Sequence, residues 1–251
     1  MDRINKKLFF DAVSQALNNF NSQLIEEYKT YFGGGTMLSW VNGCYRTSND
    51  LDFLCNLTEY QKLRKWFNNH RPLEIFVDNF KIAIARDIKQ DEYGIRIPLS
   101  IVVDNLAVAI ELEFIVENRF ELEEPIVDKA TSLPLLSYGD RFGCKLLANA
   151  DRWNDASVFA RDLIDLAVLR LSQTIPQSAI EKAEAVYKVE QPLVEAIVRF
   201  SNAPKLRQEC YRVLQIDNPV MVIDGIDKLA ADYHLSLVER EFIETDFSYL
   251  G

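Results

Sequence analysis

Hydrophobic residues recur at helical spacing near the start of the chain. The members of this apolar stripe are Leu8, Phe9, Ala12, Val13, Ala16, Leu17 and Phe20. Steps of three and four residues place such side chains on one face of a helix. The pattern then predicts a strand over residues 28–32, a glycine run, and a short helix over residues 36–41.

A period of two indicates the strands that follow. Residues 50–56 alternate, and the pattern places Leu51, Phe53 and Cys55 on the face opposite two aspartates. A helix then runs to about residue 69, with Thr58 as its expected N-cap. Three further strands are predicted over residues 82–86, 95–103 and 106–116, joined by turns at 90–94 and 104–105. In the last strand Ala107, Ala109, Glu111 and Glu113 share one face, and Val108, Ile110, Leu112 and Phe114 share the other.

The strand pattern stops after residue 134, and helical patterns replace it. The predicted helices cover residues 138–150, 157–171, 177–187, 193–200, 204–214 and 219–233. Several begin with Ser or Pro, which suit a helix start. The sequence therefore predicts an α+β fold, a mixed β-sheet with flanking helices followed by a helical bundle, with domains over residues 1–132 and 133–251.

Composition narrows the possible chemistry. The 251 residues carry 28 Lys and Arg against 38 Asp and Glu, a net charge of −10, so no global positive field attracts nucleic acid. Two histidines, His70 and His234, lie far from any candidate nucleophile, which argues against a Ser-His-Asp triad. Four scattered cysteines fit reduced thiols. Neither a membrane span nor a signal peptide is predicted, so we expect a cytoplasmic protein with no membrane partner.

An aspartate pair offers the first candidate chemistry. Asp50 and Asp52 are two residues apart on a predicted strand, so both carboxylates point to the same face. Carboxylate oxygens are the ligands that Mg²⁺ prefers. A third carboxylate from Glu111 or Glu113 would allow two Mg²⁺ ions, and we prefer Glu113 because it lies deeper in the apolar run. The alternative is that Asp-x-Asp lies on a solvated strand face.

A glycine run precedes the aspartates. Gly33-Gly34-Gly35-Thr36 stands between a predicted strand and a predicted helix start. Glycine lets the backbone approach a ligand closely, and the free N–H groups of a helix start favour anions. A glycine turn beside a carboxylate pair suits an NTP held with Mg²⁺.

Charged residues in the helical half form a second group. Lys145 and Arg152 are two turns apart on one face, and Asp162 and Asp165 also share a face. Taken alone, they are better explained as charged flanks of amphipathic helices tied by local ion pairs.

Together, four spaced blocks resemble the AbiEii/AbiGii toxin family of polymerase-β-like nucleotidyltransferases. They are Gly34-Gly35-Thr36 with Leu38, then Arg46-x-Ser48-x-Asp50-Leu51-Asp52-Phe53, then Lys145-Leu146-x-Ala148, and last Arg161-Asp162-x-x-Asp165-Leu166. The resemblance covers residues 30 to 170 and implies a nucleotidyltransferase domain followed by a helical domain that closes the nucleotide cleft. In this sequence the third carboxylate is Glu, where the superfamily commonly has Asp.

The resemblance also assigns roles to residues. It implies that Gly34, Gly35, Thr36, Arg46, Ser48 and Lys145 bind the nucleotide, that Asp50, Asp52 and Glu113 hold the metal, and that Lys145 and Asp162 complete the catalytic set. The implied reaction is Mg²⁺-dependent transfer of NMP from an NTP to an acceptor hydroxyl. Family members are typically toxins of toxin–antitoxin or phage-defence systems, and some act on tRNA, so a cognate antitoxin and an RNA acceptor are expected partners.

The sequence is also compatible with two other functions. The acceptor could be a small hydroxylated molecule, and the net charge of −10 would favour a cationic aminoglycoside. Alternatively, the chain could be a catalytically weak nucleotide-binding regulatory partner, an interpretation favoured by the glutamate in the third carboxylate position.

Overall fold

Two compact units make up the chain. The structure, a computed structural model, describes residues 5–77, 80–241 and 244. The first unit comprises Met1–Trp40 and Ser48–Ser137, and the second comprises Val41–Thr47 and Tyr138–Gly251. The boundary expected near residue 132 lies inside the first unit, and no sequence pattern placed the segment 41–47 with the helices. No helix in the described part of the chain is both long and apolar enough to cross a bilayer.

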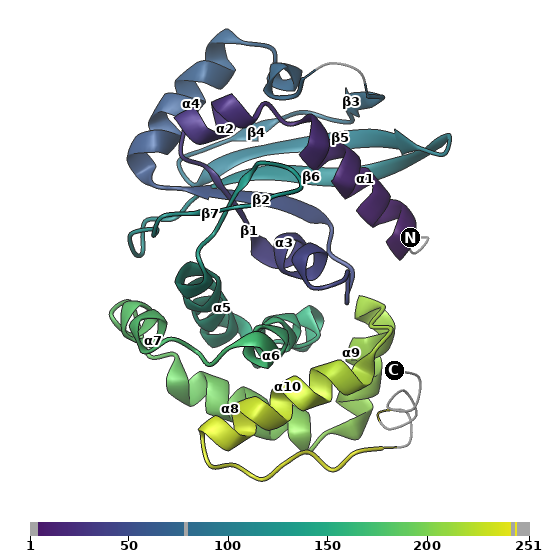
Figure 1. Cartoon of the computed structure of the whole chain (residues 1–251), viewed down its shortest axis with the longest axis vertical. Coiled ribbons are helices and arrows are strands. Elements are labelled where there is room, and N and C mark those ends of the chain that lie inside the picture. The colour runs from purple at the N-terminus through teal and green to yellow at the C-terminus, as the bar shows by residue number, and fades with distance from the viewer. Residues whose placement is uncertain (1–4, 78–79, 242–243, 245–251) are drawn as a thin grey trace. The chain divides into compact units, whose positions relative to one another are not determined.

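A mixed sheet forms the centre of the first unit (Figure 1). Its strands are β1 (Tyr31–Gly33), β2 (Asp50–Cys55), β3 (Ile82–Ile84), β4 (Lys89–Gln90), β5 (Gly94–Val103), β6 (Leu106–Val116), β7 (Ile126–Val127) and β8 (Pro134–Leu135). The order is β3-β5-β6-β2-β1-β8-β7, and β4 also pairs with β5. Strand β2 is parallel to β6 and antiparallel to β1.

The predicted hairpin over residues 95–116 is confirmed. Asp104 and Asn105 both have positive φ, 48° and 64°, as a two-residue turn between twisted strands requires. The predicted alternation in β6 is confirmed too, because Val108, Ile110 and Leu112 are buried while Glu111 is only partly buried. The two-residue strands β7 and β8 were missed, since segments so short carry no periodicity.

Two helices pack against the apolar face of this sheet, α1 (Lys6–Asn19) and α4 (Leu57–Asn69) (Figure 1). The rings of Phe53 and Phe114 lie 5.6 Å apart on that face, and Phe67 of α4 packs on Phe114. The expected N-cap Thr58 is wrong. The cap is Asn56, whose side chain accepts a hydrogen bond from the Glu59 amide at 3.0 Å.

The strand predicted over residues 28–32 is mostly wrong. The helix α2 (Ser22–Glu27) occupies the preceding segment, and β1 begins only at Tyr31. The helix α3 (Gly34–Val41) then starts directly at the end of β1. A short 3₁₀ helix (Pro72–Ile75) follows α4.

The second unit is helical in its described part, as predicted. Its α-helices are α5 (Tyr138–Arg152), α6 (Arg161–Ser172), α7 (Gln177–Glu184), α8 (Glu190–Ser201), α9 (Pro204–Leu214) and α10 (Pro219–Asp232), with a 3₁₀ turn at Ala156–Val158. Helix α6 starts later than the predicted residue 157 because Phe159 and Ala160 both adopt left-handed φ angles. Helix α10 packs closely on α6, where a Cβ on Gly225 would lie 2.2 Å from the Ala167 carbonyl oxygen.

Candidate active site

One row of paired residues crosses the sheet of the first unit from β1 to β4. The strand register places Gly33, Asp52, Glu113, Arg96 and Lys89 opposite one another in that order. Directly paired residues on neighbouring strands share a face of the sheet. The glycine turn, two carboxylates and two cationic side chains therefore follow each other along one polar face.

A second row lies next to this one. Asp50 is opposite Glu111 on β6, as Asp52 is opposite Glu113. The intervening residues Leu51 and Leu112 are fully buried on the other face. The structure thus gathers on one face the two aspartates and both candidate glutamates that the sequence indicated.

The two glutamates differ in their contacts. Glu111 accepts a 2.6 Å hydrogen bond from Arg86 Nη2, whereas Glu113 Oε2 lies 3.5 Å from Arg96 Nε. Burial raises the pKa of Glu113, the negative charge of Asp50 raises it further, and Arg96 opposes both effects. Glu113 is therefore held more loosely by its cation and is repelled by a neighbouring carboxylate. A cation bound between these carboxylates would relieve that repulsion.

The donor set fits Mg²⁺ in the kind of ligand it offers. Asp50, Asp52 and Glu113 offer only oxygen ligands, from neighbouring strands in register. Within the described residues, no three acidic, His or Cys side chains converge closely enough to hold an ion. The 3.5 Å contact between Glu113 Oε2 and Arg96 Nε is longer than a normal hydrogen bond, so the Glu113 carboxylate is able to turn away from Arg96.

The glycine turn lies directly against this acidic pair. Gly34 has a φ of +67°, and a Cβ built on it would lie 1.7 Å from Asp52 Oδ2. Gly35 and Thr36 continue into the first turn of α3, where backbone N–H groups lack partners within the helix. Thr36 is fully buried and its Oγ1 has no hydrogen-bond partner, which costs about 1–3 kcal/mol if left unsatisfied. These donors suit an anion beside Asp52.

Two other predicted nucleotide-binding residues, Ser48 and Arg46, belong to different units. Ser48 precedes β2 in the first unit and is partly buried, whereas Arg46 belongs to the second unit. Arg46 is 2% exposed and forms a bidentate pair with Asp165, at 2.6 Å from Nε and 2.7 Å from Nη2. Its Nη1 donates to the Thr47 carbonyl oxygen at 2.8 Å. Its guanidinium is thus engaged with protein acceptors.

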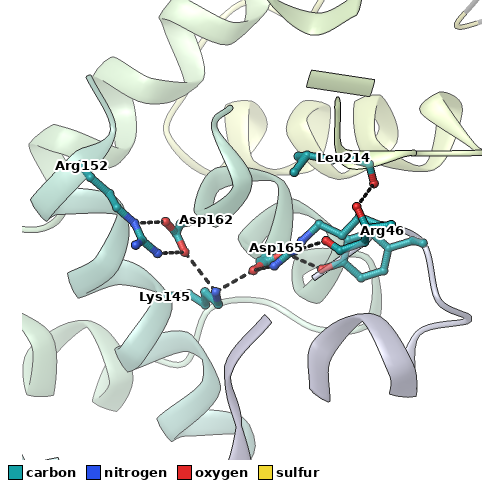
Figure 2. A network of polar contacts seen from close by, with 8 residues as sticks. Arg46, Lys145, Arg152, Asp162, Asp165 and Leu214 are labelled. Carbon is teal, nitrogen blue, oxygen red and sulfur yellow. Dashed lines mark hydrogen bonds and ion pairs between the residues drawn. The ribbon is translucent and has the colours of Figure 1, made fainter. Parts of the chain in front are cut away.

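A buried polar network occupies the second unit (Figure 2). Lys145 Nζ on α5 lies 2.6 Å from Asp165 and 3.0 Å from Asp162, both on α6. Arg152 is also on α5, and it forms a bidentate pair with Asp162 at 2.6 and 3.0 Å. The interpretation of these charges as flanks of amphipathic helices tied by local ion pairs is wrong, because the pairs join two helices and Asp165 is fully buried.

The segment Val41–Thr47 completes this network from outside the helices. Tyr45 Oη donates to Asp165 at 2.6 Å, alongside Arg46. Thr47 donates from both its amide and its Oγ1 to the Leu214 carbonyl oxygen at the end of α9 (Figure 2). Sequence reasoning gave no role to Tyr45 and placed Asp165 only among the charged helix flanks, although the Asp162 and Asp165 spacing was a usable signal.

Ion pairing shifts the pKa values of Asp162, Asp165 and Lys145 in this network. Burial alone raises the pKa of Asp165, but Arg46 and Lys145 outweigh it and hold that pKa below the usual range. For Asp162, burial likewise raises the pKa, and Lys145 and Arg152 reverse the shift. Burial lowers the pKa of Lys145, yet the two aspartates raise it overall. All five groups therefore stay charged at neutral pH.

The chain is similar to known proteins in sequence and in fold. A family model described as the nucleotidyl transferase AbiEii toxin of type IV toxin–antitoxin systems matches residues 15–211. A search of curated proteins found no match.

Two solved structures from Helicobacter pylori are similar to the chain. The crystal structure of a candidate nucleotidyltransferase has a TM-score of 0.50 and 17% identity, and the alignment covers 99% of each chain. The protein JHP933 has a TM-score of 0.47 and 18% identity, with 92% of this chain and 96% of that chain covered. At 17% identity, the first likeness shows a shared fold.

Proposed function

Because this chain belongs to the AbiEii family of nucleotidyl transferase toxins, we propose that it transfers NMP from an NTP to a hydroxyl of an RNA such as tRNA, with Mg²⁺ as the cofactor. Nucleotidyl transfer and a toxin–antitoxin role come with the family, which also supports an NTP substrate and a cognate antitoxin. The metal and the RNA acceptor are our proposals. The observation that carries the metal proposal is the position of Asp52, which lies between the Gly34 turn and Glu113 in one row.

In this mechanism the glycine turn binds the triphosphate. The backbone of Gly34 and Gly35 approaches the phosphates, and Thr36 Oγ1 gains the partner it lacks. Asp50, Asp52 and Glu113 would hold Mg²⁺, which would supply stabilisation of the charge on the transferring phosphoryl group and on the leaving pyrophosphate.

The reaction forms one bond and breaks one. The acceptor hydroxyl oxygen bonds to the α-phosphorus, the bond from the α-phosphorus to the bridging oxygen of the β-phosphate breaks, and pyrophosphate leaves. The hydroxyl proton passes to a carboxylate of this face or to water. The protein's part is positioning and electrostatic stabilisation, as in phosphoryl transfer generally.

The polar network of the second unit carries a net positive charge in this proposal. Three cations, Arg46, Lys145 and Arg152, surround two carboxylates, Asp162 and Asp165, which gives a sum of +1. The contacts of Arg46 support a role in holding Asp165 in place more than a direct contact with the nucleotide.

Replacement of the two aspartates tests the proposed function. The double variant Asp50→Asn, Asp52→Asn removes the metal's carboxylates while it keeps side-chain size, so transfer to a tRNA pool should fall by about a thousandfold or more. Transfer is measured with labelled NTPs, and circular dichroism checks the fold. The matched control is Glu111→Gln, whose carboxylate is already bound by Arg86 and should matter far less. Undiminished transfer by the double variant would rule the mechanism out.

A further inference from the structure

Beyond the carboxylates, the polar row of the sheet ends in two cations. Arg96 on β5 is opposite Glu113, and Lys89 on β4 is opposite Arg96. The Arg96 side chain is 35% exposed and Lys89 is exposed. Neighbouring strands are about 4.8 Å apart, so these cations lie about 10 and 15 Å from Asp52 along the row.

The order of the row assigns a direction to the reaction. In an in-line displacement the attacking oxygen and the leaving oxygen lie on opposite sides of the phosphorus. The glycine turn on β1 lies on one side of Asp52, and that turn suits the triphosphate tail that leaves. An acceptor that approaches from the other side of Asp52 would meet Glu113, Arg96 and Lys89 in order.

We propose that Arg96 and Lys89 bind backbone phosphates of the acceptor strand next to the attacking hydroxyl, so that the acceptor is a single-stranded end of a polyanion. This inference rests on the proposed function and assigns to it the two residues that recognise the acceptor. A guanidinium binds phosphate through several donors, and an exposed ammonium adds a point charge.

The contacts of Arg96 suit this exchange. Its Nη1 donates to Asp91 Oδ2 at 3.1 Å, and its Nε lies 3.5 Å from Glu113. Asp91 is itself fixed at the hairpin, since its Oδ1 accepts hydrogen bonds from the amides of Tyr93 and Gly94. If Glu113 turned away from Arg96, Asp91 would still hold Arg96 in place, and the Nε side of the guanidinium would be able to bind a phosphate.

Lys89 provides an independent cation. Within the described residues its ammonium forms no ion pair, and it lies one strand further from the carboxylates than Arg96. It can therefore be changed without touching the metal-binding carboxylates.

The two cations also select against a cationic acceptor. A net charge of −10 attracts an aminoglycoside at long range, but charges more than about 8 Å apart are largely screened at physiological salt. At the site itself, Arg96 and Lys89 would repel the amines of such a molecule and attract phosphates. At this end of the row, the two cations favour a phosphate over an amine.

Binding of a short fluorescein-labelled single-stranded RNA of mixed sequence, followed by anisotropy without NTP, tests the assignment. Lys89→Ala and Arg96→Gln should each raise the Kd for RNA by about tenfold and lower the salt-dependence slope by about one. The matched control is Lys65→Ala, an exposed lysine on α4, which packs on the opposite face of the sheet through Phe67 and Phe114. Its Kd should stay at the native value.

A kinetic measurement separates recognition from a general structural effect. Lys89→Ala should raise KM for RNA in NMP transfer with little change in kcat, and the Kd for NTP by titration calorimetry should not change. Arg96→Lys should recover part of the RNA affinity that Arg96→Gln loses.

Several results would overturn the assignment: unchanged RNA affinity and salt slope in both variants, no RNA binding by the native protein, or transfer to an aminoglycoside panel but not to RNA. The proposed function fails separately, through undiminished transfer by the Asp50 and Asp52 variant. Loss of RNA binding in Lys89→Ala would stand even in that case.

Discussion

Because Gly34 has no side chain, the Asp52 carboxylate can lie directly against its backbone. The φ of +67° at Gly34 lies in the left-handed region, and the space a Cβ would need is filled by the Asp52 carboxylate. Asp52 is a terminal carboxylate on a rotatable side chain, so it could move away from an added methyl group. The glycine therefore fixes where Asp52 points more than it fixes the fold.

At this scale we predict that Gly34→Ala separates activity from stability. The strained φ should cost about 1–2 kcal/mol of unfolding free energy, and displacement of Asp52 should lower NMP transfer by about a hundredfold or more. Urea unfolding and labelled-NTP transfer measure the two effects.

Gly43→Ala is the matched control for this prediction. Gly43 has a similar φ of +78°, but nothing lies within 4 Å of its built Cβ. It should lose comparable stability and keep its transfer activity. If the two variants are equally active, Gly34 does not position Asp52.

A buried network of charges joins α5, α6 and the segment Val41–Thr47. Asp165 accepts hydrogen bonds or ion pairs from Tyr45, Arg46 and Lys145, and all four residues are buried. Such a buried cluster is costly to break because each remaining charge loses its partner without regaining water.

We predict that Asp165→Asn destabilises the protein by about 3–5 kcal/mol, since Arg46 and Lys145 would stay buried with one carboxylate fewer. Urea unfolding gives the value. Asp232→Asn is the matched control, because Asp232 forms a bidentate pair with Arg170 of the same helix α6 at 2.6 and 2.9 Å but is partly exposed. It should cost about 1 kcal/mol or less. Equal costs would show that burial of the network contributes nothing.

For the whole molecule, the two units hold different chemistry within one chain of net charge −10. The first carries the row of carboxylates and cations on its sheet, and the second carries the buried network on its helices. The chain passes between the units three times, at residues 40–41, 47–48 and 137–138, so each unit depends on two separate segments.

Acid should destabilise the helical unit through two of its carboxylates. Asp162 and Asp165 have pKa values held below the usual range by their cations, so they bind protons less readily folded than unfolded. Their contribution to stability is complete above about pH 4 and is lost as the pH falls below that value.

The measurement is the urea midpoint between about pH 5 and pH 3, followed by fluorescence of Trp153 in a variant with Trp40→Phe and Trp66→Phe. Trp153 then reports on the second unit alone. Asp162→Asn should flatten the pH dependence because one of the two groups is removed. A midpoint that does not change over this range would contradict the assignment.

Much of the candidate site could be predicted because its residues lie close together in the sequence. Counting outward from the turn at Asp104 and Asn105 pairs Arg96 with Glu113, so the sequence contained the signal for Arg96 even though it was missed. By contrast, the parallel pairing of β2 with β6 joins residues about sixty positions apart. No local pattern sets that register, which is why Glu111 and Glu113 could not be separated beforehand.

The sequence by itself determined the α+β class, the buried and polar faces of the long strands, the helices of the second half and the family. These follow from periodicity, turn residues and short motifs, which act over a few neighbouring positions. Only the tertiary structure decided which cation meets which carboxylate, that residues 41–47 join the helices, and that Gly34 abuts Asp52. Such contacts depend on packing between distant segments, and the pattern of either segment alone carries no information about its partner.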